Sequence, residues 1–201
     1  MPAFSLILLA CAWALYFALH SILASNSFKE QVKQWSTGVY HWYRLGYSFI
    51  AGAGFLAVML FAAFIPSENV FAPFGWMRYA GLIVAAWGVI VCRLAFRHYS
   101  LGTFLGTSDK QDEDESLVTT GILSRVRHPL YSGLILISLG YWIYLPSWTN
   151  LVTVACWWLY LPVGIWLEEK KLIARFGQEY IEYKKRVPAL APSLLKLFKK
   201  D

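Results

Sequence analysis

The chain has 201 residues, of which 58% are hydrophobic and only 15% are charged, and its formal net charge is +6. This composition is too apolar for a typical soluble domain, and the length suits one compact unit. The sequence therefore predicts a single membrane domain over residues 1–201. Its three cysteines lie in apolar segments without CxxC or histidine spacing, which predicts neither a disulfide framework nor a metal site.

The N-terminal part, residues 1–96, contains three apolar segments that are each about long enough to cross a membrane as a helix. The first segment begins without a basic region and lacks a clear small-residue cleavage site, so we expect it to be retained as an anchor. The three predicted spans cover residues 4–24, 45–65 and 79–96.

Arg93 lies in the last turns of the third predicted span, and Arg97 follows just beyond it. In one interpretation both arginines extend to the membrane interface from the end of the span. In the other, Arg93 faces a polar cavity, because a charge inside a membrane is costly unless it serves a site. The acidic segment that follows is either a solvated loop or a charged gate for a ligand.

Two further apolar segments lie at 131–144 and 151–167, and the turn at 146–148 predicts that they form a helical hairpin. The first of them is short for a membrane span, and Pro162 predicts a kink in the second. Beyond Glu169, apolar and aromatic residues recur at intervals of three and four, which places them on one face of an amphipathic helix. This face either packs on the lipid surface or forms a pocket, and it carries Leu172, Phe176, Tyr180 and Tyr183.

The fold class predicted from these segments is an all-α integral membrane protein with about five transmembrane helices and a cytoplasmic amphipathic C-terminal helix. Lysine and arginine concentrate in alternate connections and in the tail, whereas the other two loops hold only Arg78. The positive-inside rule then places the C-terminus in the cytoplasm. The basic tail suits anionic membrane lipid better than nucleic acid, for which no folded reading module is visible.

The segment 121–133, GILSRVRHPLYSG, combines basic residues with the start of a predicted helix. Pro129 fixes its own backbone and disfavours a helical conformation at His128, so His128 is expected in a turn just ahead of the helix. The unpaired N–H groups of that helix end, together with Arg125, Arg127 and His128, form a candidate carboxylate or phosphate site. The alternative is a helix that begins with basic residues at the membrane surface.

Three motifs in the C-terminal half, RHPLYSG at 127–133, LEEKKL at 167–172 and FGQEYIEYKKRVP at 176–188, resemble one superfamily. It is the isoprenylcysteine carboxyl methyltransferase and phospholipid methyltransferase superfamily of integral membrane enzymes, and the resemblance covers about residues 101–192. The resemblance implies S-adenosylmethionine as cofactor and makes residues 97–201 the cofactor-binding part. The implied contacts are Gly102 of an LG-x-F element, Arg127, His128, Pro129, Tyr131, Gly133, Glu168 and Glu169.

A pocket for this cofactor needs donors for the methionine carboxylate, a carboxylate for the amino group, and an apolar slot for adenine. We expect Arg127 and His128 to meet the carboxylate, together with the adjoining helix N-terminus. Either Glu168 or Glu169 is expected to bind the amino group or the ribose. The expected walls of the pocket are Tyr131, Phe176 and Tyr180.

The N-terminal elements HSILAS at 20–25 and WYRLGYS at 42–48 resemble the NnrU-type and methanethiol S-methyltransferase-like branch of the superfamily. This resemblance implies a prokaryotic enzyme, and with it the inner membrane. Its acceptor is then a small thiol or a lipophilic thiol or carboxyl compound such as an isoprenylcysteine-like molecule, and a lipid amine stays open. Candidates to hold an anionic acceptor are Arg44, Arg93, Arg97 and His98, and His20 or His41 is the candidate base.

A second class of function is a non-catalytic membrane carrier or accessory protein that shares the fold. Transport through the helices predicts charged or polar residues along several spans. Only Arg93 clearly meets that expectation, so the sequence favours the methyltransferase.

Overall fold

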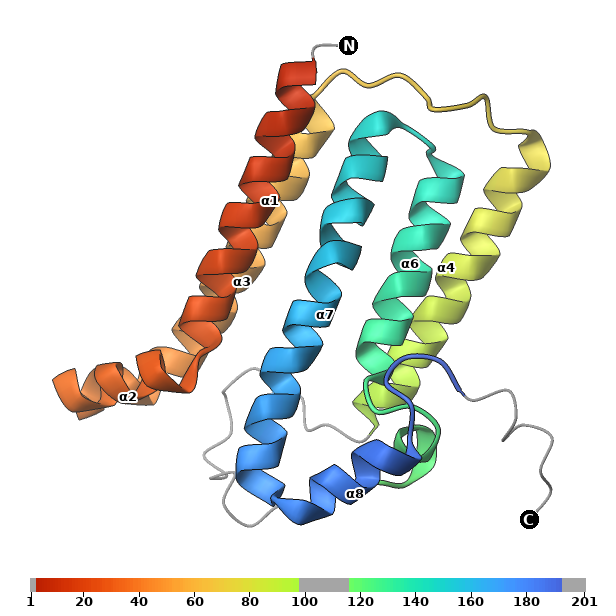
Figure 1. Cartoon of the computed structure of the whole chain (residues 1–201). Helices are drawn as coiled ribbons and strands as arrows, with labels where there is room; N and C mark the ends of the chain where they lie inside the picture. The colour runs from red at the N-terminus through yellow and green to blue at the C-terminus, as the bar shows by residue number, and fades with distance from the viewer. Residues whose placement is uncertain (1–2, 98–115, 193–201) are drawn as a thin grey trace, which may run out of the picture. The chain divides into compact units, whose positions relative to one another are not determined.

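The computed structural model describes residues 3–97 and 116–192, except for the side chains of Thr37 and His41. Within these ranges the chain is helical and has no β-strand (Figure 1). The described residues fall into two compact units, one made of 3–73 and 145–160, the other of 74–97, 116–144 and 161–192. The elements are α1 (Ala3–Ala24), α2 (Asn26–Trp35), α3 (Thr37–Phe64), α4 (Gly75–Phe96), η2 (Gly121–Ser124), α6 (Pro129–Tyr144), α7 (Trp148–Phe176) and α8 (Gln178–Arg186).

Four helices are long and apolar enough to cross a membrane: α1, the part Trp42–Phe64 of α3, α4 and α7. Their lengths are 22, 23, 22 and 29 residues. The fourth predicted span corresponds to α6, an apolar helix of 16 residues, which is shorter than the roughly 20 residues that a full crossing needs. The all-α class is therefore confirmed, whereas the count of five full spans is not.

In the first unit, α1 and α3 lie side by side (Figure 1) and pack with the first half of α7. Trp13 of α1 is fully buried, and its indole N–H donates a hydrogen bond to Thr153 Oγ1 of α7 at 3.3 Å. Leu9, Ala62 and Ile65 complete the buried core around this indole. The unit is thus held by apolar packing and by neutral hydrogen bonds between helices.

In the second unit, α4 and α6 approach so closely that glycine is needed on both (Figure 1). A Cβ atom added to Gly88 would lie 2.6 Å from the carbonyl oxygen of Gly133, and one added to Gly133 would lie 2.4 Å from Cys92 Sγ. Gly81 and Gly140 form a second contact of this kind, two turns along the helices. These contacts fix the start of α6 against α4.

The apolar stripe predicted beyond Glu169 lies on two helices instead of one. α7 ends at Phe176, and Gly177 has φ +55°, a conformation that L side chains rarely adopt, so α8 begins in a new direction at Gln178 (Figure 1). Because the chain turns here, the stripe folds back on itself and forms a small core. Its buried members are Tyr180, Tyr183 and Val187, packed against Leu117, Leu172, Ile173 and Phe176.

Candidate active site

The start of α6 has the local structure that Pro129 predicts. Pro129 is the first residue of the helix, and His128 precedes it in a non-helical conformation. Both residues are buried, with His128 only 3% exposed. The imidazole is therefore directed into the second unit instead of towards solvent.

A buried carboxylate, Glu169 near the end of α7, lies at the centre of the charged groups. Its Oε1 atom accepts hydrogen bonds from Arg127 Nη2 at 2.7 Å and Arg127 Nε at 3.0 Å, and lies 3.2 Å from His128 Nε2. Its Oε2 atom lies 2.5 Å from Lys184 Nζ of α8. A carboxylate that is only 5% exposed requires such partners, because an unpaired buried charge is strongly destabilising.

Arg127 joins this carboxylate to the C-terminal end of α8. Its Nη1 atom donates to the carbonyl oxygen of Lys184 at 3.0 Å and to that of Val187. All three nitrogens of the guanidinium thus have carboxylate or carbonyl partners. The C-terminal carbonyls of a helix carry partial negative charge, so a cation is favourable there.

The tail that follows α8 lies along the turn before α6. The backbone N–H groups of Arg127 and His128 donate to the carbonyl oxygens of Pro188 and Ala189, each at 2.9 Å. These two N–H groups therefore have partners within the chain.

The two adjacent glutamates differ in their surroundings. Glu168 Oε2 lies 3.6 Å from His128 Nδ1, and the Glu168 side chain is 40% exposed, compared with 7% for Glu169. Glu168 is therefore accessible to a ligand, whereas Glu169 is saturated by the chain's own cations. We call the group formed by Arg127, His128, Glu168, Glu169 and Lys184 the charged cluster.

Tyr180 of α8 is 1% exposed, and its hydroxyl has no hydrogen-bond partner among the residues that the structure describes. Burial raises the pKa of this phenol, and the nearby Glu169 carboxylate raises it further. The hydroxyl therefore keeps its proton and is available as a donor. The described residues include no group of histidine, cysteine and carboxylate side chains suited to a metal ion.

The remaining residues expected at the cofactor also belong to the second unit. The rings of Tyr131 and His128 lie 5.7 Å apart, and Phe176 packs against the core that contains Tyr180. Gly133 lies in the close contact between α4 and α6. Gly102 lies outside the described residues.

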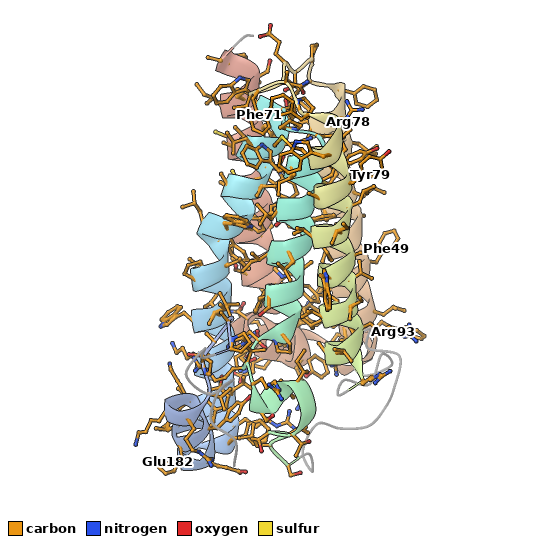
Figure 2. The ribbon with its side chains drawn as sticks, turned by 90° about the vertical axis from the view of Figure 1, so that its right-hand side faces the viewer. Phe49, Phe71, Arg78, Tyr79, Arg93 and Glu182 are labelled. Carbon is orange, nitrogen blue, oxygen red and sulfur yellow. The ribbon has the colours of Figure 1, made fainter. Side chains whose placement is uncertain are left out.

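The structure does not gather the expected acceptor-side residues into one group. Arg93 and Arg97 are exposed on α4, and Figure 2 shows Arg93 pointing outward, as in the interpretation that places it at the interface. His20 and Arg44 are half-buried in the other unit, where the Tyr47 hydroxyl lies 3.2 Å from the His20 ring nitrogens. His98 lies outside the described residues.

Sequence reasoning missed Lys184 and the carbonyl groups at the end of α8. A signal for Lys184 was present, because it lies four residues after Tyr180 and so one helical turn along the same face. No sequence pattern predicted that Val187, Pro188 and Ala189 would supply backbone acceptors to the turn before α6.

The four helices that are suited to membrane crossing define an integral membrane protein. The charged cluster gives this protein a buried polar site near the end of α7. Residues 76–179, about half of the chain, match the family described as phospholipid methyltransferase. The chain belongs to this family. The match covers both the turn before α6 and the two glutamates of α7.

The relatives that the chain resembles include two kinds of enzyme. Protein-S-isoprenylcysteine O-methyltransferase from Rattus norvegicus is 34% identical over 131 residues, which cover 62% of this chain and 46% of the relative. Methanethiol S-methyltransferase from Pseudomonas deceptionensis is 28% identical over 194 residues, which cover 90% of this chain and 70% of the relative. The chain spans about half the length of the isoprenylcysteine relatives that it matches first, and no solved structure matches it.

Proposed function

We propose that the protein is an integral membrane methyltransferase that uses S-adenosylmethionine. The observation that carries this proposal is the charged cluster, in which Arg127 and His128 of the RHP turn meet Glu169, 42 and 41 residues further along the chain, at hydrogen-bond distance. Both motifs lie in the segment that matches the family, and the relatives are named methyltransferases.

The donor set of the cluster fits this cofactor. Glu168 is the accessible carboxylate and is suited to the cationic amino group or to the ribose hydroxyls. Lys184 is the accessible cation, with a side chain that is 44% exposed, and is suited to the methionine carboxylate. Tyr131, Phe176 and Tyr180 supply aromatic walls. When bound, the cofactor's sulfonium would supply the methyl group.

Arg127 and Glu169 have a positioning role in this proposal. Arg127 is engaged with Glu169 and with α8, so it acts on the ligand through the geometry that it maintains. This changes the expectation that Arg127 meets the methionine carboxylate directly. His128, held between both glutamates, fixes the orientation of the Glu168 carboxylate.

The acceptor class that we propose is a small thiol or a lipophilic thiol or carboxyl compound of the isoprenylcysteine type. The names of the two groups of relatives support these two classes. Methyl transfer to such an acceptor depends mainly on orientation and on exclusion of water. His20, Arg44, Arg93, Arg97 and His98 stay candidates for the acceptor side.

We further propose a prokaryotic inner-membrane location with a cytoplasmic C-terminus. The support is the exposed basic end of α8, with Lys184, Lys185 and Arg186, in line with the positive-inside rule. A reporter that is active only in the periplasm, fused to the C-terminus, should be inactive. Strong reporter activity would reverse the orientation.

The deciding experiment is calorimetric titration of the detergent-purified protein with S-adenosylmethionine and with S-adenosylhomocysteine. Saturable binding of both is expected, and it justifies assays of methyl transfer to methanethiol and to a prenylcysteine analogue. Absence of binding by folded protein would reject the proposal in favour of a non-catalytic carrier or accessory protein. The Arg78→Lys variant is a control, because it keeps the charge of an exposed residue that lies outside the cluster and is not a candidate for the acceptor side.

A further inference from the structure

The buried hydroxyl groups of two tyrosines on α8 differ in their hydrogen bonding. Tyr180 and Tyr183 are 1% and 4% exposed, and their rings pack edge to face with centroids 5.8 Å apart. The Tyr183 hydroxyl donates a hydrogen bond to the carbonyl oxygen of Leu123 at 2.6 Å. The Tyr180 hydroxyl has no such partner among the described residues. Burying a hydroxyl without a partner costs free energy that a phenylalanine in the same space would not.

No member of the charged cluster beside Tyr180 accepts a hydrogen bond from this hydroxyl. Glu169 Oε1 is shared by Arg127 and His128, and Glu169 Oε2 is paired with Lys184. The Arg127 guanidinium lies near the Tyr180 hydroxyl, but a guanidinium can only donate to the phenol oxygen and cannot accept its proton. The hydroxyl proton therefore has no acceptor among the described residues.

We propose that the Tyr180 hydroxyl is a ligand-binding group that donates a hydrogen bond to an acceptor oxygen of the cofactor. The acceptor is either an oxygen of the ribose or an oxygen of the methionine carboxylate, since both present the same chemistry. This inference rests on the proposed function, and it gives Tyr180 a polar role in addition to the apolar wall expected from sequence.

Access to the hydroxyl depends on the side chains around it. The Tyr180 hydroxyl is buried, so a contact with the cofactor forms only when neighbouring side chains move aside. Lys184 is the most exposed member of the charged cluster and lies one turn from Tyr180 on α8.

The test compares Tyr180→Phe with Tyr183→Phe in the full-length, detergent-purified protein. For Tyr180→Phe the thermal midpoint without ligand should stay unchanged or rise, whereas the Kd for S-adenosylmethionine and for S-adenosylhomocysteine should increase about 5- to 100-fold. For Tyr183→Phe the midpoint should fall and the Kd of the folded protein should stay within about twofold. Opposite effects on stability and affinity distinguish a ligand contact from a structural hydroxyl.

Several outcomes would overturn the inference. A Tyr180→Phe variant with parental affinity rejects it while leaving the methyltransferase proposal intact. A lower midpoint with parental affinity would show that a buried water satisfies the hydroxyl. If the parent binds neither compound, both the inference and the proposed function fail together.

A third compound locates the acceptor oxygen. 5′-Methylthioadenosine carries the ribose but lacks the amino-acid part of the cofactor. If Tyr180→Phe also weakens binding of this compound, the hydroxyl contacts the ribose. If the variant weakens only the binding of the complete cofactor, the contact is with the carboxylate.

Discussion

The two compact units satisfy their buried polar groups in different ways. In the first unit, neutral groups form hydrogen bonds between helices, such as the bond from Trp13 to Thr153 and the contact of 2.8 Å between the Ser21 and Tyr160 hydroxyls. In the second unit the buried groups of the cluster are charged and centre on Glu169. Neutral pairs suit a helix inside lipid, whereas desolvated charges require several partners. In our proposal the second unit therefore binds the cofactor through its charged cluster, whereas neutral packing holds the helices of the first unit together.

The largest expected effect comes from removing the centre of the charged cluster. In Glu169→Ala, Arg127 and Lys184 lose their shared carboxylate, and the free energy of unfolding should fall by about 3–5 kcal/mol. Thermal unfolding in detergent measures this change, and binding of S-adenosylmethionine should be lost with it.

Glu182→Gln is the matched control for Glu169→Ala. Glu182 also pairs with a lysine, at 2.8 Å from Lys185 Nζ, but it is exposed and points outward (Figure 2). Lys185 lowers the pKa of this carboxyl, yet water screens the pair, so no measurable loss of stability is expected. Equal losses in the two variants would show that burial does not distinguish the two ion pairs.

The next effect concerns the packing that holds the start of α6. In Gly133→Ala the new methyl group would meet Cys92 Sγ at 2.4 Å and the Gly88 carbonyl oxygen at 2.8 Å. Since backbone and side chain must both shift, we expect a loss of about 1–3 kcal/mol in unfolding free energy. Gly46→Ala in α3 is the control, because its added Cβ has no neighbour within 4 Å. A Gly133→Ala variant as stable as Gly46→Ala would contradict the close contact.

A binding effect without a stability effect is expected for the accessible glutamate. Glu168→Gln removes a charge whose side chain is 40% exposed and whose carboxylate lies 3.6 Å from His128 Nδ1. The Kd for S-adenosylmethionine should rise about 10- to 100-fold, as expected for loss of a charged hydrogen bond. The thermal midpoint should stay near that of the parent. A reversed pattern, with lost stability and parental affinity, would assign the ligand to Glu169.

The predictions from sequence were correct where a single residue or the length of an apolar segment determines the local structure. Pro129 fixed the start of α6 and left His128 non-helical, and apolar length predicted α1, α3, α4 and α7. The resemblance placed Arg127 and Glu169 at one cofactor but did not predict their direct ion pair, because ion pairs distant in sequence leave no periodic signal. The break at Gly177 was missed because the stripe from Leu172 to Tyr183 keeps its helical spacing across the turn.

The smallest expected effect concerns a neutral hydrogen bond in the first unit. In Trp13→Phe the indole N–H that donates to Thr153 Oγ1 at 3.3 Å is lost, while most of the aromatic packing in the first unit stays. The bond is long for its kind, so a loss of about 0.5–1.5 kcal/mol from hydrogen bonding is expected in the free energy of unfolding. The Kd for S-adenosylmethionine should remain parental, because the cluster belongs to the other unit. A large rise in Kd with little loss of stability would instead give the first unit a part in cofactor binding, and the separation of packing from chemistry would fail.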